Sequence, residues 1–287
     1  MRNNWYDGIV VGVDGSAESM AAVDWAALTA DRHSAHLTVL GAHGTEPSNP
    51  HAVLGVAAHT LADARDAVER AVARLDGARP GGHQVEQRVV PGEPVYVLMQ
   101  RATSNDLVVV GRRGLGVWGR AALGSVSGAL AASARGPVAV VPAGAWTGDP
   151  RRVVVGVDGD DAGPQLDMAF AEAQQRACPL EIVHALDPDR LADTGPGGPA
   201  DLPSQTERER EGVRHRVAPW SEKYPAVSAT LRFRGENAVD ALLHDLSAED
   251  LVVVGGRPHS PTIGRVWNSV SDAVLRQSAG PVIVVHE

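Results

Sequence analysis

The chain has 287 residues, of which 44% are hydrophobic, so it is long enough for two domains of roughly 150 residues, each with its own core. Its formal net charge of −9 argues against a general nucleic-acid binder, which needs a positive surface to displace counterions from phosphates. A single cysteine, Cys178, excludes a disulfide framework within the chain, and no apolar run approaches the roughly 18 residues of a membrane span.

The first apolar segment, Ile9–Val13, has the length of one strand and enters a glycine turn at once, so it predicts a buried strand and not a signal peptide. Together with the reducing compartment that a lone cysteine fits, this predicts a cytoplasmic protein with no membrane association. Ser16 follows the turn and is placed to act as the N-cap of a helix that runs to Ala30. The next elements expected in chain order are a strand at His36–Leu40, a helix at Ala57–Leu75, a strand at Val85–Val90, a helix at Glu93–Ala102, a strand at Leu107–Val110, a helix at Ser125–Ala134 and a strand at Val138–Val141.

Strands that alternate with helices predict an α/β fold of the doubly wound, Rossmann-like type, with a five-stranded parallel sheet and helices on both faces. In such open sheets a ligand binds outside the carboxyl ends of the strands, where the winding reverses direction. If the first and fourth strands are neighbours (order 3-2-1-4-5), this reversal lies between Asp14, which opens the D-G-S turn, and Gly111, which opens a glycine-rich segment.

The whole pattern occurs twice at one constant offset of 144 residues. The segment IVVGVDGS at 9–16 recurs as VVVGVDGD at 153–160, and DLVVVG at 106–111 recurs unchanged at 250–255. A chance resemblance would not keep register from one end of a half to the other, so the chain is predicted to be a duplicated domain.

The two copies are predicted to be a first domain at 1–142 and a second at 152–287, joined by a glycine-rich linker at 143–151. Strands of the second copy are expected near 153–157, 180–185, 228–233, 251–254 and 282–285. Its polar insert, Asp187–Gln205, contains several prolines and glycines and is expected to be a mobile loop. The fifth strand of each copy is an apolar edge, and such edges are normally covered.

A glycine motif follows the fourth strand of the first half, in the segment GRRGLGVWGRAALGSVS at 111–127. Gly111, Gly114 and Gly124 are spaced G-x2-G-x9-G, with Ser125 next and a helix after it. Glycine lets the backbone approach a ligand closely, and a helix N-terminus presents unpaired N–H groups to an anion. Ser125 and Ser127 would add hydroxyl donors, so the segment predicts a cradle for a polyphosphate. The alternative is a glycine-rich turn with Ser125 as an ordinary N-cap.

Polar side chains near this loop have two interpretations each. Asp14 ends the first strand, where a carboxylate accepts hydrogen bonds from ribose or a base or helps to hold a metal ion; the alternative is a turn-forming aspartate in D-G-S. Arg112, Arg113 and Arg120 give the loop positive charge that either meets phosphate or is solvated.

These segments, VVGVDGS, DLVVVGRRG…GSVS and GPVAVVP, resemble the universal stress protein family, and both halves match it over nearly their full length, as in its tandem-domain members. The resemblance implies an ATP-binding protein, with Mg²⁺ or Mn²⁺ usually accompanying the nucleotide. Domains of this family pair through the fifth strand, so the resemblance also implies that Val138–Val141 pairs with Val282–Val285 in an internal pseudo-dimer. Asp14 would then contact ribose or adenine, and the backbone near Ala42 and Val110 would line the adenine. The ATP-binding residues that it implies are Asp14, Gly15, Ser16, Ala42, Val110, Gly111, Arg112, Gly114, Gly124, Ser125, Val126 and Ser127.

The second half departs from the motif, because Pro258 and Asn268 replace two of its glycines and Asp160 replaces the serine of D-G-S. Proline removes an N–H donor, and an added carboxylate would repel phosphate, each at a cost of about 1 to a few kcal/mol. We therefore expect a degenerate, mainly structural half, with at most a weak second site at Asp158, Gly255 and Ser269.

Two classes of function follow. In the first, the protein binds ATP as a nucleotide-dependent regulator of a stress response and is at most a slow ATPase, since no catalytic residue is evident. In the second, it is an ATP pyrophosphatase or nucleotidyl-transfer enzyme of the same superfamily, although the first loop, VDGSAES, lacks the SGGxDS-like motif of such enzymes. Protein partners are left unidentified, and a homodimer of the tandem chain is left open.

Overall fold

Strands and helices alternate along both halves of the chain, as the sequence pattern predicts. The computed structural model describes residues 6–44, 60–78, 85–101, 106–115, 123–144, 149–158, 162–187, 202–256 and 270–286. The first half contains β1 (Gly8–Gly12), α1 (Ala17–His33), β2 (His36–His43), α2 (Leu61–Ala78), β3 (Val85–Pro91), α3 (Pro94–Met99), β4 (Asp106–Gly111), α4 (Ser125–Ser133) and β5 (Val138–Val141). The second half contains β6 (Arg152–Gly156), α5 (Gly163–Arg176), β7 (Leu180–Ala185), α7 (Leu202–Lys223), β8 (Ala229–Arg234), α8 (Ala238–Leu243), β9 (Asp250–Gly256), α9 (Val270–Gln277) and β10 (Val282–His286).

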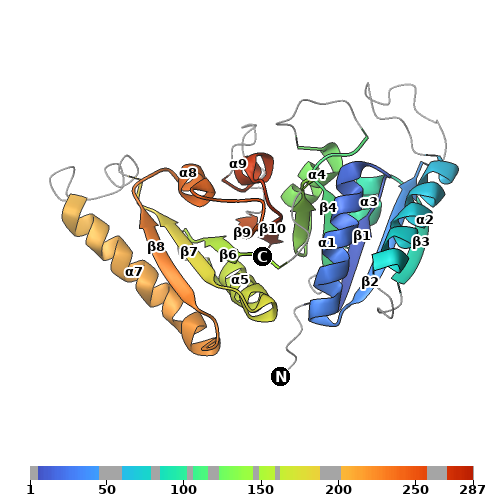
Figure 1. Cartoon of the computed structure of the whole chain (residues 1–287). Helices are drawn as coiled ribbons and strands as arrows, with labels where there is room; N and C mark the ends of the chain where they lie inside the picture. The colour runs from blue at the N-terminus through green and yellow to red at the C-terminus, as the bar shows by residue number, and fades with distance from the viewer. Residues whose placement is uncertain are drawn as a thin grey trace.

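The described strands form one ten-stranded sheet in the order β3-β2-β1-β4-β5-β10-β9-β6-β7-β8 (Figure 1). Within each half the order is therefore 3-2-1-4-5 with parallel neighbours, which confirms the predicted topology. In the middle of the sheet β5 and β10 pair antiparallel, with Ala139 opposite Ile283. This pairing is the internal pseudo-dimer that the two apolar edges and the family resemblance predict.

A hydrophobic core covers each face of this sheet and continues through both halves. Successive strand residues point to opposite faces, so Ile9 and Val11 belong to one core and Val10 to the other. Helices α1, α2, α5 and α7 pack on the first face, and α3, α4, α8 and α9 pack on the second (Figure 1). Because both faces are covered, the inner strands β1, β4, β5 and β10 are continuous apolar runs, whereas the edge strands β3 and β8 also carry charged residues.

The loop predicted at Asp187–Gln205 is wrong at its carboxyl end. The segment expected to be a loop through Gln205 gives way earlier to helix α7, which begins at Leu202. Pro203, which suggested a loop, lies in the first turn of this helix, where a backbone N–H is not needed for the helical hydrogen bonds. No helix in the described part of the chain is long and apolar enough to cross a membrane.

A buried polar cluster joins α1 of the first half to α5 of the second. The Glu172 carboxylate accepts hydrogen bonds from the Tyr6 hydroxyl (2.7 Å) and from Nε of Arg176 (2.7 Å), and Nε2 of His33 lies 3.1 Å from it. Arg176 also donates to the Thr29 hydroxyl at 3.0 Å. Burial opposes charge on Glu172, but Arg176 and His33 together hold the pKa of this carboxyl well below its usual range. The cluster is therefore an ionic contact that fixes how the two halves pack.

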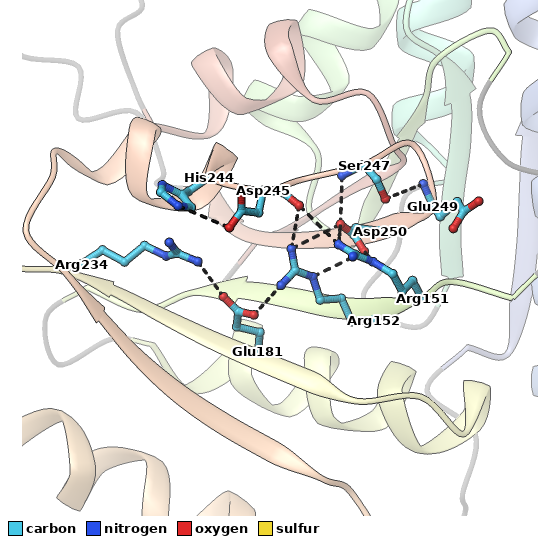
Figure 2. A network of polar contacts seen from close by, with 9 residues as sticks. All are labelled: Arg151, Arg152, Glu181, Arg234, His244, Asp245, Ser247, Glu249 and Asp250. Carbon is cyan, nitrogen blue, oxygen red and sulfur yellow. Dashed lines mark hydrogen bonds and ion pairs between the residues drawn. The ribbon is translucent and has the colours of Figure 1, made fainter.

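A second polar network lies at the amino ends of β6 and β9 (Figure 2). Asp250, which is fully buried, accepts hydrogen bonds from Arg151 (3.0 Å) and from the Ser247 amide (2.9 Å). Glu181 joins the guanidinium groups of Arg152 (2.5 Å) and Arg234 (3.0 Å). Burial alone would raise the pKa of Asp250, but these hydrogen bonds and positive charges hold it below its ordinary value. Arg234 reaches back to the network from the end of β8, and Arg152, Glu181 and Asp250 lie near the amino ends of their strands, so we assign the network a structural role.

Candidate functional site

The carboxyl ends of β1 and β4 lie next to each other, as the predicted strand order requires, because the two strands pair in parallel. Asp14 follows β1, and its carboxylate accepts hydrogen bonds from the Ser16 amide (2.9 Å) and from the Leu115 amide (3.1 Å). The turn after β1 is thus joined directly to the loop after β4. Ser16 accepts a hydrogen bond from the Ser19 amide and caps α1, as predicted.

Three glycines let the backbone segments of this site approach one another. A Cβ atom added at Gly111 would lie 2.7 Å from the carbonyl carbon of Glu18, so the strand end packs directly on the first turn of α1. At Gly114 it would collide with the Asp14 carboxylate. At Gly124 it would lie 3.1 Å from the Arg112 carbonyl oxygen. Each position therefore needs glycine for packing, whether or not a ligand is present.

Helix α4 begins at the end of this loop without a side-chain cap. Gly124 is its N-cap residue and supplies no side-chain acceptor, so Ser125 is the first helical residue. The alternative in which Ser125 is the N-cap is therefore wrong. The N–H groups of Ser125, Val126 and Ser127 belong to the first turn, which has no intrahelical acceptors for them, and a helix start of this kind suits an anion. The Ser125 side chain is exposed beside them.

The Ser127 hydroxyl, which the sequence suggested as a donor to phosphate, bonds to the protein backbone instead. It is buried and donates a hydrogen bond to the Arg112 carbonyl at 2.7 Å, and the Gly124 amide donates to the same oxygen at 2.9 Å. These two bonds close the loop on itself. The Ser127 side chain thus shapes the loop, and only its backbone N–H is available as a donor in the first turn.

The arginines of the loop are held by protein groups. Arg113 donates through its backbone amide (2.5 Å) and its Nε (2.8 Å) to the buried carboxylate of Glu18. The Arg112 guanidinium donates to the carbonyl oxygens of Arg276 (3.2 Å) and Ser278 (2.9 Å) in the second half, and burial lowers its pKa. Arg120 lies outside the described residues.

Family comparison identifies both halves. The model of the universal stress protein family matches residues 6–142 and again residues 150–286. The chain belongs to the universal stress protein family. A universal stress protein of Mycolicibacterium smegmatis is 34% identical over 290 residues, which are 97% of each chain.

Solved structures of the family match as well. A universal stress protein from Archaeoglobus fulgidus has the same fold across the whole molecule, with a TM-score of 0.68 at 16% identity over 98% of both chains. A universal stress protein crystallised in complex with cAMP is 30% identical, covers 49% of this chain and 99% of its own, and has a TM-score of 0.38.

The residues that the family resemblance assigns to adenine flank Asp14. Ala42 lies near the end of β2 and Val110 near the end of β4, and β1 runs between these two strands. Both side chains belong to the core on the α3 and α4 face of the sheet. The structure therefore brings together the strand ends, the turn at Gly15 and the start of α4, although their contacts with a nucleotide stay predictions.

Two charged residues at the site were missed by the sequence reading. Glu18 is an acidic residue in the first turn of α1, a common position for a helix, and only its burial beside Arg113 distinguishes it. Arg70 comes from α2, and its Nη2 lies 2.5 Å from where a Cβ of Gly15 would be. Gly15 has φ +82°, a backbone conformation that favours glycine, whereas the Arg70 guanidinium ends a flexible side chain that could move aside. No local pattern marks Arg70, because its position depends on how α2 packs on β2 and beside α1.

The corresponding place in the second half is only partly described. Asp158 follows β6 and is exposed, and a Cβ at Gly255 would lie 3.2 Å from the Gln165 amide nitrogen. The residues that distinguish the second motif, Asp160, Pro258, Asn268 and Ser269, lie outside the described residues. The degeneracy of this half and the exact domain boundaries therefore stay predictions.

Proposed function

We propose that the first half binds ATP and that the protein is a nucleotide-dependent regulator of a stress response. The observation that carries this proposal is the uncapped N-terminus of α4, which follows a glycine loop bound to Asp14 across the β1–β4 crevice. The backbone amides of Ser125 to Ser127 would receive the phosphates, and Asp14 would face the ribose or adenine.

The glycine cradle and the exposed hydroxyl of Ser125 fit a polyphosphate, and we propose Mg²⁺ or Mn²⁺ as its counterion. Such an ion would neutralise phosphate charge beside the loop. The Arg112 and Arg113 side chains are engaged elsewhere, so the backbone amides and the metal carry the neutralisation in this proposal. The lone cysteine is consistent with a cytoplasmic location.

The described residues favour ATP binding without fast hydrolysis. The carboxylates that contact the loop in this part of the structure, those of Asp14 and Glu18, both accept hydrogen bonds from it, so neither is placed as a general base. Slow hydrolysis would follow from positioning alone. We therefore propose at most a slow ATPase, and we place nucleotidyl transfer second.

Calorimetric titration of the purified full-length chain with Mg-ATP tests the proposal, using a pair of matched variants. Gly114→Ala puts a Cβ into the Asp14 carboxylate and should weaken ATP binding about tenfold or more. Gly128→Ala makes the same change inside α4, where the added Cβ makes only ordinary contact with Leu123, so it should keep the wild-type affinity.

Equal affinities for the two variants, or no ATP binding by the wild type, would overturn the proposal. A product assay completes the test. Release of AMP and pyrophosphate, or turnover near the roughly 10 per second of a typical enzyme, would favour the enzymatic alternative.

A further inference from the structure

The backbone of Arg112 closes the loop that we assign to phosphate. Its amide donates to the carbonyl of Val141 in β5 at 2.9 Å. Its own carbonyl accepts the Gly124 amide at 2.9 Å and the Ser127 hydroxyl at 2.7 Å, at the start of α4. The position of this one residue therefore sets the distance between the two ends of the loop.

The side chain of the same residue leaves the site and crosses to the second half. Its Nη1 donates to the carbonyl oxygens of Arg276 and Ser278, at 3.2 and 2.9 Å. These two carbonyls lie at the carboxyl end of α9, where a cation is favoured by the unpaired carbonyls and the helix dipole. The second half thus holds the residue that shapes the loop of the first.

A reciprocal contact comes back from the second half. Gly256 stands at the position of the repeat that corresponds to Arg112, and the ring of His286 fills the space beside it. The Nε2 of His286 lies 3.0 Å from the carbonyl oxygen of Ala131, and its Nδ1 lies 3.0 Å from that of Gly136. Ala131 belongs to the last turn of α4. The second half therefore contacts the carboxyl end of the helix whose amino end forms the proposed site.

We propose that Arg112 and His286 couple nucleotide binding in the first half to the packing of the second half. Arg112 is then a positioning residue of the loop, held by α9, and not a phosphate ligand. His286 acts from the far end of α4. The second half has a role even if it binds no nucleotide of its own, because it sets the geometry of the site. This inference rests on the proposed ATP site in the first half.

The test measures affinity and local exchange in the full-length chain. In the wild type, Mg-ATP should slow amide hydrogen exchange in the segment 276–286 of the second half, which reaches the first half through these contacts and through the β5–β10 strand pair. Arg112→Ala and His286→Ala should each weaken ATP binding about fivefold or more and remove most of that slowing, because coupling between two sites is reciprocal. His286→Gln, which keeps a side-chain N–H donor, should give a smaller loss.

His244→Ala is the matched control, because His244 is a partly exposed histidine of the same half that pairs with Glu236 and Asp245. It should change neither readout. If Arg112 bound phosphate directly, Arg112→Ala alone would weaken binding while His286→Ala and the exchange of 276–286 stayed as in the wild type, and the coupling would be overturned. Failure of the wild type to bind ATP would instead defeat the proposed function itself.

Discussion

Glu172 shows how much a single buried carboxylate contributes to the joining of the two halves. It has no exposure to solvent, and Tyr6, His33 and Arg176 all contact it. Two of these residues come from the first half of the chain and one from the same helix. A buried charge is tolerated only when such partners are present, so loss of the carboxylate leaves Arg176 without its counterion.

Glu172→Gln should therefore lower the free energy of unfolding by about 3–5 kcal/mol at neutral pH. Because the folded pKa of Glu172 lies below that of the unfolded chain, its contribution is present above about pH 4.3 and is lost as the pH falls below that value. Burial raises the pKa of the Tyr6 hydroxyl. The stability that this protonated hydroxyl contributes is therefore lost as the pH rises above about 10. Urea denaturation across pH measures both effects. The exposed Glu222→Gln is the control, and an equal loss in the two variants would contradict the account.

At the scale of elements, α1 holds two neighbours through arginine–carboxylate pairs of similar geometry but different burial. Glu18 binds Arg113 of the β4–α4 loop and is buried, with its side chain 8% exposed. Asp24 binds Arg74 of α2 through two hydrogen bonds, at 2.6 and 2.7 Å, with side chains 30% and 52% exposed. Solvent screens the second pair, so only the first should matter much for stability.

Glu18→Gln should lower the free energy of unfolding by about 1–3 kcal/mol, because the N–H donors of Arg113 lose their charged acceptor. Asp24→Asn should lower it by at most about 1 kcal/mol. Chemical denaturation of the two variants side by side gives the comparison. A larger effect for the exposed pair would show that burial does not decide these contributions.

For the whole molecule, the decisive feature is that β5 and β10 turn two five-stranded sheets into one. All four residues of β5 are buried, and its edge is covered by β10. A sheet edge of this kind, once uncovered, offers unpaired N–H and C=O groups to any other strand.

The first half expressed alone, as residues 1–144, should therefore self-associate through β5, which sedimentation analysis would detect as a dimer or larger species. The same fragment with Val140→Pro should stay monomeric, because Val140 lies opposite Val282 in the strand pair and proline has no N–H to donate to a partner strand. A monomeric fragment with the native edge would argue that the pairing with β10 contributes little.

The sequence by itself determined the α/β class and the duplication, because continuous apolar runs and a repeat in register are local and periodic signals. The strand order was expected from the common doubly wound arrangement, and the pairing of the fifth strands from their apolar edges together with the family resemblance. The sequence also placed Asp14 and the glycines of the loop at neighbouring strand ends. Those residues meet because parallel strands bring their carboxyl ends to one edge.

Only the tertiary structure decided where the long side chains go. The sequence left two interpretations of Arg112, at phosphate or in solvent, but its guanidinium binds carbonyls 164 and 166 residues away. Tyr6 contacts Glu172, 166 residues away in the chain, and Arg70 reaches Gly15 because α2 packs on β2 and beside α1. Such contacts depend on how whole elements dock, and a flexible charged side chain carries no periodic signal that could reveal its partner in advance.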